Sequence, residues 1–479
     1  MSELSSAIET ASVQTATKRS TKYPLYVFWI LFIISMLNSI DRYILTGAAN
    51  IIAKELHLGI DQIGYLSSAF VLLFTFSVVP FGFLADRIKR KDVIAAAVGV
   101  WSLATAFTVL ANSFTTLFLA RSVLGIGEAG YSPSSQALLS DYFRQKNRGQ
   151  VMGWWAVSGQ VGLLIGIIMG GVIAGLYHGA WHLAFLIAGI PGLLLAFVAW
   201  RMREPRRNQA DEEPKLLTNH ASSQEVEAVG ETYLAEKPRT VLAQFLVLIQ
   251  NKTLVVLIIM QIFSLFVLGG TVTYLSIFMQ QKDTFGLSSA QAAFFTGFAV
   301  LLAASIGVIV GGYLADWWMP RFVGARVLVS GLGFLLSMPT YAAAVLIAVY
   351  SHNLPLYTVF FSLSAIFLNL GTGPTAAALQ EIVPTMLRGS AVAVSLFLSH
   401  ILGDAFSAPL IGILARSFDH SGQNFQNGVA GHDLMLALIF LFPPSLAIAG
   451  IVAIFGSRWV KGDMEAAKRV DLLGTSLSA

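Results

Sequence analysis

The chain has 479 residues, of which 56% are hydrophobic and 12% charged, and its mean hydropathy is +0.71. Soluble globular proteins carry about 25% charged residues, so this composition indicates an integral membrane protein. The absence of cysteine excludes disulfides and thiolate metal sites. The sequence pI near 9.1 raises the question of nucleic-acid binding, which the positions of the basic residues answer below.

Twelve apolar segments are long enough to cross a bilayer, and they predict an all-α membrane protein with twelve transmembrane helices. They cover residues 24–50, 62–84, 92–112, 115–140, 149–176, 183–203, 254–281, 289–316, 325–350, 355–381, 389–415 and 433–458. Nearly every gap between them is short. The exception is 204–240, a polar stretch without apolar periodicity, which we interpret as a flexible linker between two six-helix bundles.

This linker divides the chain into five predicted parts. The N-terminal stretch has no short apolar core followed by a small-residue cleavage site, so we interpret it as a tail rather than a signal peptide. The parts are an N-terminal cytoplasmic tail (1–22), an N-terminal bundle (23–203), a cytoplasmic linker (204–240), a C-terminal bundle (241–459) and a C-terminal cytoplasmic tail (460–479).

The positions of the basic residues predict the orientation. If both termini are cytoplasmic, only Lys54, Lys282 and Arg416 of the 30 Lys and Arg residues fall on the opposite side, and Arg42 and Arg121 fall within the membrane. All the others lie on the cytoplasmic side, as the positive-inside rule requires. This distribution accounts for the high pI without nucleic acid.

The two halves show weak internal repetition at a nearly constant separation, which indicates duplication. The matched features are GFLADRIKRK (82–91) with GYLADWWMPR (312–321), Pro133 with Pro374, and Arg148-Gly149 with Arg388-Gly389. Parallel six-helix halves with a substrate site between them are an architecture of secondary transporters. The sequence therefore predicts two pseudo-symmetric bundles with a site at their interface.

The first repeated string places charges at the cytoplasmic end of the second helix. Asp86 can pair with Arg87, with Arg90 or with a helix end of the other half. Such a pair would hold the cytoplasmic side shut in one state and break in the other. An ordinary positive-inside loop is the alternative interpretation. The second half keeps Asp316 but has Trp317 in place of the next basic residue, so we expect a weaker latch there.

The stretch from Gly125 to Gly130, GIGEAG, matches the dinucleotide-binding pattern G-x-G-x-x-G. That site requires a preceding strand and an α/β unit. Here the glycines lie inside an apolar helix, where small residues let neighbouring helices approach closely. We therefore expect these glycines to serve packing.

Four charged residues fall at membrane depth in the first and fourth predicted helices. At 1.5 Å per residue, Asp41 and Arg121 lie at a similar level and can pair, whereas Arg42 points about 100° away from Asp41 and can reach Glu128. A static salt bridge between helices is one interpretation, but desolvation offsets much of the electrostatic gain of a buried ion pair, so such a pair adds little stability. A carboxylate whose Arg partner can move away is better suited to binding and releasing a proton.

The substrate-binding candidates come from three helices. His400 and Asp404 are four residues apart and share a helix face, where they can bind a substrate head group or join a proton path. A His hydrogen-bonded to a neighbouring helix is the alternative. Asn369, near mid-depth, can bond another helix or contact a ligand, and Tyr131 completes the set.

Several of these motifs together resemble the spinster-like branch of the major facilitator superfamily. They are Ile40-Asp41-Arg42-Tyr43, the string at 82–91, Trp101-Ser102 and RSVLGIGEAGY from Arg121 to Tyr131. The match is dense over roughly 40–175 and is mostly one of pattern in the second half. The resemblance implies a proton-linked or proton-sensitive transporter of sphingolipids or lysolipids, in which Asp41 and Glu128 sense protons beside Arg42 and Arg121.

The predicted function is therefore proton-coupled transport of an amphipathic small molecule by alternating access. The predicted partners are the substrate, protons and the lipid bilayer, without cofactor, metal or nucleic acid. We expect a monomer in the cell (inner) membrane.

Three alternative functions differ in the sequence features that they require. Organic-anion and sugar/proton symporters of the same superfamily share the helix-four pattern R-x-x-x-G-x-x-E-A, and there Arg42 or Arg121 would bind the substrate's carboxylate. An intramembrane enzyme is disfavoured because the chain lacks H-E-x-x-H and G-x-x-x-x-G-K-[ST]. A sensor without transport would need an added soluble domain, for which the linker is too short and too polar.

Overall fold

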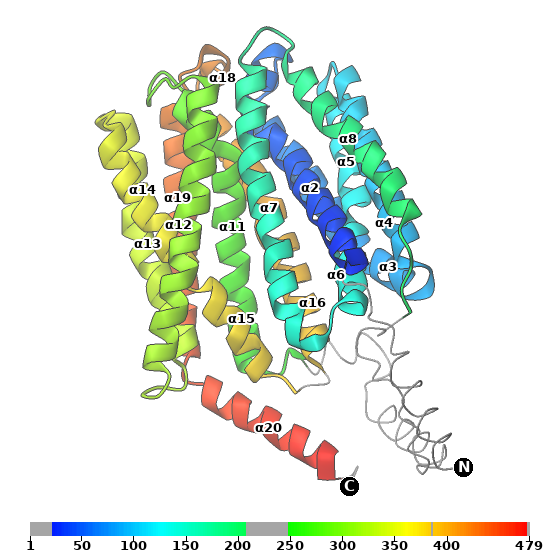
Figure 1. Ribbon diagram of the computed structural model, residues 1–479. Coiled ribbons are helices and arrows are strands. Elements are labelled where there is room, and N and C mark those ends of the chain that lie inside the picture. Colours follow the sequence, from blue (N-terminus) through cyan, green and yellow to red (C-terminus); the bar gives the residue numbers. More distant parts are fainter. Residues whose placement is uncertain (1–21, 207–247, 385–386, 477–479) are drawn as a thin grey trace.

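The computed structural model describes residues 22–206, 248–384 and 387–476. Across these residues the chain forms two helical bundles that lie side by side (Figure 1). We call the end of the molecule that carries α18 the upper end and the end that carries α20 the lower end. The predicted N-terminal tail up to residue 21, and all of the predicted linker beyond residue 206, lie outside the described residues.

The N-terminal bundle contains the first six predicted transmembrane segments. Its helices are α2 (Lys22–Glu55), α3 (Ile60–Arg87), α4 (Arg90–Phe107, extended by the 3-10 turn η1, Thr108–Leu110), α5 (Phe114–Ala129), α6 (Tyr131–Tyr142), α7 (Gln145–Ala174) and α8 (Trp181–Arg201). The predicted and observed boundaries agree to within a few residues.

The C-terminal bundle contains the other six segments and two shorter helices outside them. Its elements are α11 (Lys252–Gln280), α12 (Ser289–Trp318), α13 (Ala325–Tyr350), α14 (Leu354–Asn369), α15 (Thr372–Glu381), α16 (Arg388–Ser399), the π-helical segment η3 (His400–Asp404), α17 (Ala405–Phe418), α18 (Asn424–Asn427), α19 (Gly431–Gly456) and α20 (Val460–Ser476).

Eleven helices in the described part of the chain are long and apolar enough to cross a membrane. The predicted segment 115–140 is not among them, because Gly130 separates α5, with 16 residues, from α6, with 12. Together α5 and α6 cover 114–142, so each of the twelve predicted segments is helical. This agrees with the predicted twelve-helix membrane fold.

The repeated prolines explain two matching breaks. Proline has no backbone N–H, so the carbonyl four residues before it loses its helical partner. Four residues before Pro133 is Ala129, where α5 ends, and four before Pro374 is Leu370, which follows α14 directly. The repeat seen in the sequence thus places an equivalent break in the fourth and tenth spans.

The last helix lies outside the membrane-spanning set. Figure 1 shows α20 running across the lower end of the molecule. Val460 and Ala467 on this helix are buried, and the Asp463 carboxylate accepts a hydrogen bond of 2.8 Å from the backbone N–H of Thr253 at the start of α11. The predicted C-terminal tail is therefore helical over most of its length, and the first part of this helix packs against the C-terminal bundle.

The two bundles are joined tightly at the upper end. Helix α3 packs on α17, and α7 packs on α12. A Cβ on Gly64 of α3 would lie 2.5 Å from the carbonyl oxygen of Ala408, and a Cβ on Gly171 of α7 would lie 2.8 Å from that of Ser289. Only glycine permits such an approach of two backbones. The upper seams are therefore closed.

Polar contacts reinforce this closure. The Tyr274 hydroxyl of α11 lies 3.0 Å from the carbonyl oxygen of Ile60 and 2.9 Å from that of Ala408, so it donates to either bundle. The Asn50 amide donates to Gln280 at 3.0 Å. Arg416 pairs with Asp61 across the seam at 3.0 Å. Since each contact joins the bundles, opening the upper end breaks all of them.

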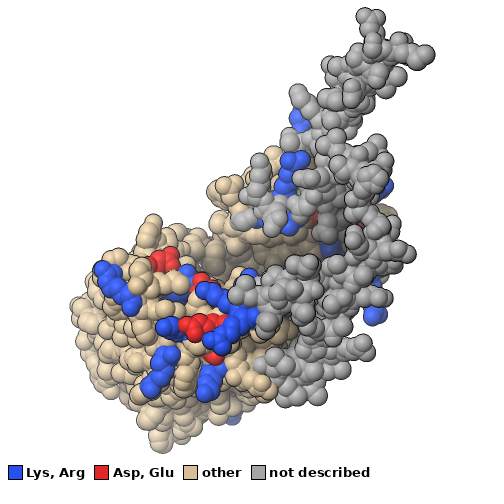
Figure 2. Space-filling model, turned by 90° about the horizontal axis from the view of Figure 1, so that it is seen from below, with Lys and Arg blue, Asp and Glu red and all other residues tan. Residues whose placement is uncertain are grey.

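The lower end is more open. Six described glycines there have no atom within 4 Å of the position that a Cβ would take; they are Gly82, Gly153, Gly312, Gly373 and Gly389 from helices of the two bundles, and Gly462 of α20. Between the two ends, the rings of Phe76 on α3 and Phe397 on α16 meet edge to face at 5.9 Å. Seen from the lower end, Lys and Arg side chains gather over this face with acidic side chains among them (Figure 2).

Candidate functional site

The strongest charge pair at membrane depth joins α2 and α5. Arg42 donates to one oxygen of Glu128 from Nη2 at 2.9 Å and from Nε at 3.2 Å. The Glu128 side chain has no exposed surface, whereas that of Arg42 is 28% exposed. The other Glu128 oxygen has no hydrogen-bond partner among the described residues. The predicted Arg42–Glu128 contact is thus present, with Arg42 on its accessible side.

The predicted pairing of the Asp41 and Arg121 side chains is wrong in detail. Arg121 contacts α2 at the expected level, but its Nη1 and Nη2 donate to the backbone carbonyls of Asp41, at 3.4 Å, and Arg42, at 3.2 Å. Helix depth fixes the level of a residue but not its rotation about the helix axis. The guanidinium therefore meets the main chain of α2 before it reaches the carboxylate.

Asp41 is left as a buried carboxylate without a hydrogen bond. Its side chain lies near Trp101 and Thr105 of α4, its exposed fraction is 0%, and neither oxygen has a hydrogen-bond partner in the described parts of the chain. Burying an unpaired charge is costly, and a carboxyl group avoids that cost by taking up a proton. The environment of Asp41 therefore favours a group that exchanges a proton.

The opposite bundle contributes a second polar pair. His400 Nδ1 lies 3.5 Å from Asp404 Oδ2, and the two side chains are 30% and 25% exposed. Asp404 is also close enough to Arg42 for a favourable charge interaction. The predicted shared face of His400 and Asp404 is therefore present, and Asp404 lies opposite the Arg42–Glu128 pair.

This polar pair lies on a local irregularity. His400 to Asp404 form the π-helical segment η3 between α16 and α17, and such segments occur frequently at functional sites. Gly269 of α11 provides room for the Asp404 side chain, because a Cβ on Gly269 would overlap Asp404 Oδ1. On the same helix, Gln261 accepts a hydrogen bond of 2.5 Å from Ser395 of α16. Both contacts fix the position of η3 within its own bundle.

The predicted cytoplasmic latch is described only in part. The side chain of Asp86 is outside the described set, and Arg87 is exposed. Arg90 forms an ion pair with Asp141 at the end of α6 and donates to the carbonyl of Ala137 at 3.1 Å. Asp141 was not among the predicted partners of Arg90, because the two residues are 51 positions apart in the chain and helix spacing does not relate them.

An equivalent cluster lies in the C-terminal bundle. Arg326 at the start of α13 pairs with Glu381 at the end of α15, and its Nη2 lies 3.5 Å from Asp316. Arg90 and Arg326 occupy equivalent places in the two halves, as do Asp141 and Glu381. Arg326 of the next helix thus takes the place of the missing basic neighbour of Asp316, whose side chain is 73% exposed. The weaker latch expected in the second half stays a prediction.

Two substrate-binding candidates lie in the packing between helices. Tyr131 is 2% exposed, donates from its hydroxyl to the carbonyl of Leu31 at 2.5 Å and accepts from Trp155 Nε1 at 3.4 Å. The amide of Asn369 donates to the carbonyl of Ala365, one turn earlier in its own helix, at 2.8 Å. Neither geometry points to a ligand contact, because both side chains already have protein partners.

Replacing Tyr131 with Phe is expected to lower stability by about 1–2 kcal/mol, because the hydrogen bond to Leu31 of α2 and the one from Trp155 of α7 are both lost. The apparent affinity for substrate and the pH dependence of uptake should not change. Thermal unfolding of the purified protein and concentration-dependent uptake would measure these quantities. Weaker substrate affinity at unchanged stability would instead identify Tyr131 as a substrate contact.

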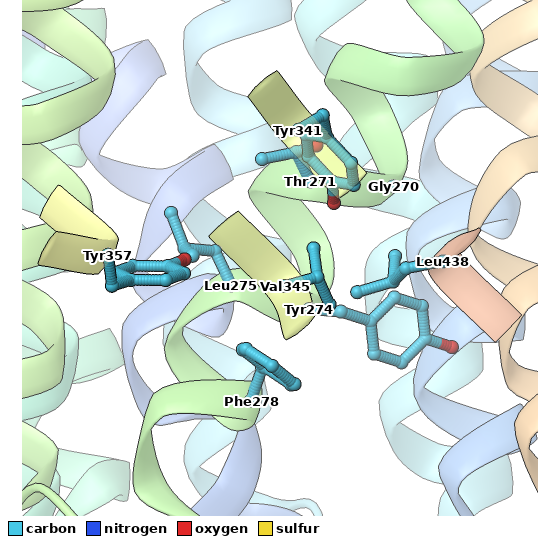
Figure 3. Close-up of a pocket in the computed structure, with 9 residues that line it drawn as sticks. All are labelled: Gly270, Thr271, Tyr274, Leu275, Phe278, Tyr341, Val345, Tyr357 and Leu438. Carbon is cyan, nitrogen blue, oxygen red and sulfur yellow. The ribbon is translucent and has the colours of Figure 1, made fainter. Parts of the chain in front are cut away.

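Two cavities lie away from these charges. One, of about 10 Å³, lies inside the C-terminal bundle. Among its lining residues, Thr271 and Tyr341 lie close together and Tyr357 lines another side (Figure 3). This volume holds roughly one water molecule, so the cavity is too small for a substrate. A larger one, of about 320 Å³, lies at the upper seam between the bundles and is lined in part by Gln62 and Arg416.

The expected packing role of the glycine-rich string is confirmed. Gly125 and Gly127 lie within α5, where a Cβ on Gly125 would come 2.5 Å from the carbonyl oxygen of Phe70 and one on Gly127 would come 2.7 Å from the backbone nitrogen of Trp101. These glycines bring α3 and α4 against α5. The close packing sets the positions of Glu128 and Arg121 relative to α2.

Comparison with known proteins identifies the family of this chain. The protein-family model described as Major Facilitator Superfamily matches residues 31–408. Protein spinster of Drosophila melanogaster is 26% identical over 388 residues, which is 81% of this chain but only 61% of that protein. The sphingosine-1-phosphate transporter SPNS2 of Danio rerio is 26% identical, covering 94% of this chain and 87% of the relative.

A solved structure has the same fold. It is a bacterial homologue of the human lysosomal transporter spinster in an inward-facing, unoccupied conformation, with a TM-score of 0.73, 24% identity and coverage of 94% of this chain and 98% of that one. The resemblance to spinster proteins drawn from the motifs is therefore confirmed. The chain belongs to the major facilitator superfamily and is a multi-pass membrane transporter similar to its spinster-like branch.

Proposed function

We propose that this protein is a proton-coupled secondary transporter of an amphipathic, lysolipid-like or sphingolipid-like molecule. The observation that carries the proposal is the charge cluster of α2 and α5, in which Asp41 is buried without a hydrogen-bond partner among the described residues and Glu128 is held by Arg42. Charges at this depth are costly in a membrane and are kept where they serve a function.

The cluster suggests how a proton and a substrate can be linked. A charged Glu128 holds Arg42 by an ion pair, whereas a protonated Glu128 holds it only by weaker hydrogen bonds to its carbonyl oxygen. Arg42 is then available to an anionic group of the substrate on its accessible side. Asp404 and His400 face the same region from the other bundle and suit a cationic or hydrogen-bonding group. Protonation of Glu128 thereby changes the affinity for substrate.

We propose that the lower end faces the cytoplasm, with both termini on that side, in the cell (inner) membrane. The concentration of basic side chains at this end supports the assignment. The closed upper seams then correspond to an inward-open state. Asp86, Arg87 and Arg90 belong in this proposal to the latch that closes the lower end in the opposite state, with the two six-helix bundles of a monomer rocking about the site.

The substrate class rests on two arguments. The relatives include transporters named for sphingosine 1-phosphate. The site also combines few charges with apolar walls, since Phe70 and Phe74 lie against Arg42 at the level of Glu128. An organic anion or sugar remains the alternative substrate, bound through Arg42 and driven by the same proton site.

Uptake into proteoliposomes tests the function. The substrates compared are radiolabelled sphingosine 1-phosphate, a lysophospholipid, a hexuronate and a hexose, each with and without an imposed pH gradient. We expect accumulation of a lipid substrate that depends on the gradient. Accumulation of the hexuronate or hexose alone would favour the alternative, and lipid uptake that ignores the gradient would refute proton coupling.

A further inference from the structure

One aromatic ring contacts both guanidinium groups of the charge cluster. The Phe70 ring of α3 lies 4.6 Å from the guanidinium carbon of Arg42 and 5.0 Å from that of Arg121, measured to the ring centroid. Phe74, one turn later and stacked on Phe70, lies 4.9 Å from Arg42 only. The face of an aromatic ring attracts cations, most strongly where water is excluded.

The ring contact stabilises the cluster because only one of the two guanidinium groups is hydrogen-bonded to a carboxylate among the described residues. Arg42 has Glu128, but Arg121 bonds only carbonyl oxygens among its described partners, and its Nε has none. Two like charges in a poorly solvated site repel each other. A ring face stabilises both without taking up or releasing a proton, so it leaves the carboxylates free to titrate.

Phe70 is itself held in a fixed place. It is 4% exposed, and its carbonyl oxygen lies against Gly125 of α5. Two residues earlier on α3, the Ser68 hydroxyl donates to the carbonyl of Ala405, which directly follows Asp404 in the opposite bundle. The helix that carries the ring thus packs against the charge cluster on one side and is hydrogen-bonded to the opposite bundle next to Asp404 on the other.

We propose that Phe70 is a positioning residue that holds Arg42 and Arg121 beside Glu128 and Asp41 through its ring face. This inference rests on the proposed proton-coupled function and names a residue outside the recognised motifs. Without the ring, Arg42 is held less firmly and neutralises Glu128 less well, so Glu128 takes up its proton at a higher pH. Simple core packing by Phe70 predicts no such change.

The test measures the pH midpoint of uptake in Phe70→Leu, Phe70→Tyr and the wild type. Because Phe70→Leu removes the ring, its pH midpoint should lie about 0.5–1 pH unit above that of the wild type. Phe70→Tyr keeps the ring and should have the wild-type midpoint. The matched control is Phe185→Leu, since Phe185 is equally buried in the same bundle and contacts no described cation. Phe185→Leu should be less stable than the wild type, and its pH midpoint of uptake should be unchanged.

Fluorinated phenylalanines at position 70 separate charge from shape. Each added fluorine weakens the ring face while keeping its size, so the midpoint should rise step by step with fluorine number. A midpoint that is unchanged across this series and in Phe70→Leu would overturn the positioning role.

A second readout distinguishes this inference from the proposed function. The infrared carboxyl band that disappears in Glu128→Gln reports protonation of Glu128 without transport. If wild-type uptake ignores pH but the band midpoint shifts in Phe70→Leu, the role of Phe70 stands and proton coupling fails. If uptake depends on pH and neither midpoint moves, proton coupling stands and the role of Phe70 fails.

Discussion

Glu128→Gln is expected to abolish proton-driven accumulation of substrate while leaving the protein folded. A carrier that moves one proton with each substrate can concentrate the substrate about tenfold for each pH unit of gradient. The amide that replaces the carboxyl group cannot exchange a proton at any working pH, so accumulation should fall to equilibrium. Uptake into proteoliposomes with a stepped pH gradient measures this directly.

The variant should still exchange substrate across the membrane without a gradient. The carbonyl oxygen of the new amide can accept the hydrogen bonds of Arg42, so the link between α2 and α5 is retained. Glu55→Gln is the matched control, because Glu55 accepts bonds from Gly179 and Trp181 at the upper end, away from the cluster. Gradient-driven accumulation by Glu128→Gln would refute its proton-carrying role.

Asp41→Asn identifies which carboxyl group carries the transported proton. Asp41 has no hydrogen-bond partner to lose among the described residues, so this change should not destabilise the protein. If both variants lose accumulation, the two groups act together. Wild-type pH dependence in both would defeat the mechanism as a whole.

Cross-linking the upper seam is expected to stop transport almost completely. Asn50 of α2 and Gln280 of α11 bond each other at 3.0 Å across the bundles. The chain has no cysteine, so Asn50→Cys with Gln280→Cys gives a unique pair without further engineering. A short reagent with two thiol-reactive groups should hold the upper end closed, because alternating access requires this contact to break. A reagent with a cleavable spacer makes the block reversible.

The controls separate locking from damage. Each single cysteine variant, treated alike, should keep most of its activity. Ser337→Cys with Ser364→Cys places a cross-link within the C-terminal bundle, where the two hydroxyls are 2.9 Å apart, and should leave transport intact. Full activity of the cross-linked Asn50–Gln280 pair would mean that the upper seam does not open during transport.

The helices and their membrane placement were predictable because hydrophobic length and helix geometry are local properties of the chain. The twelve apolar segments and the common level of Asp41 and Arg121 follow from spacing along a helix, whereas the break after Ala129 was found only in the structure. The distribution of basic residues predicted the orientation in the membrane, and the sequence motifs indicated the family.

Contacts between helices depend on rotation about the helix axes and on residues far apart in the sequence, which spacing does not specify. Only the tertiary structure shows that Arg121 bonds the main chain of α2 and that Arg90 and Arg326 take Asp141 and Glu381 as partners. It also places Phe70 against two guanidinium groups. The sequence alone indicated which charges fall within the apolar segments. The packing of α2, α3 and α5 decided which of them meet, because side-chain contacts in a bundle are set by how closely and at what angle the helices approach.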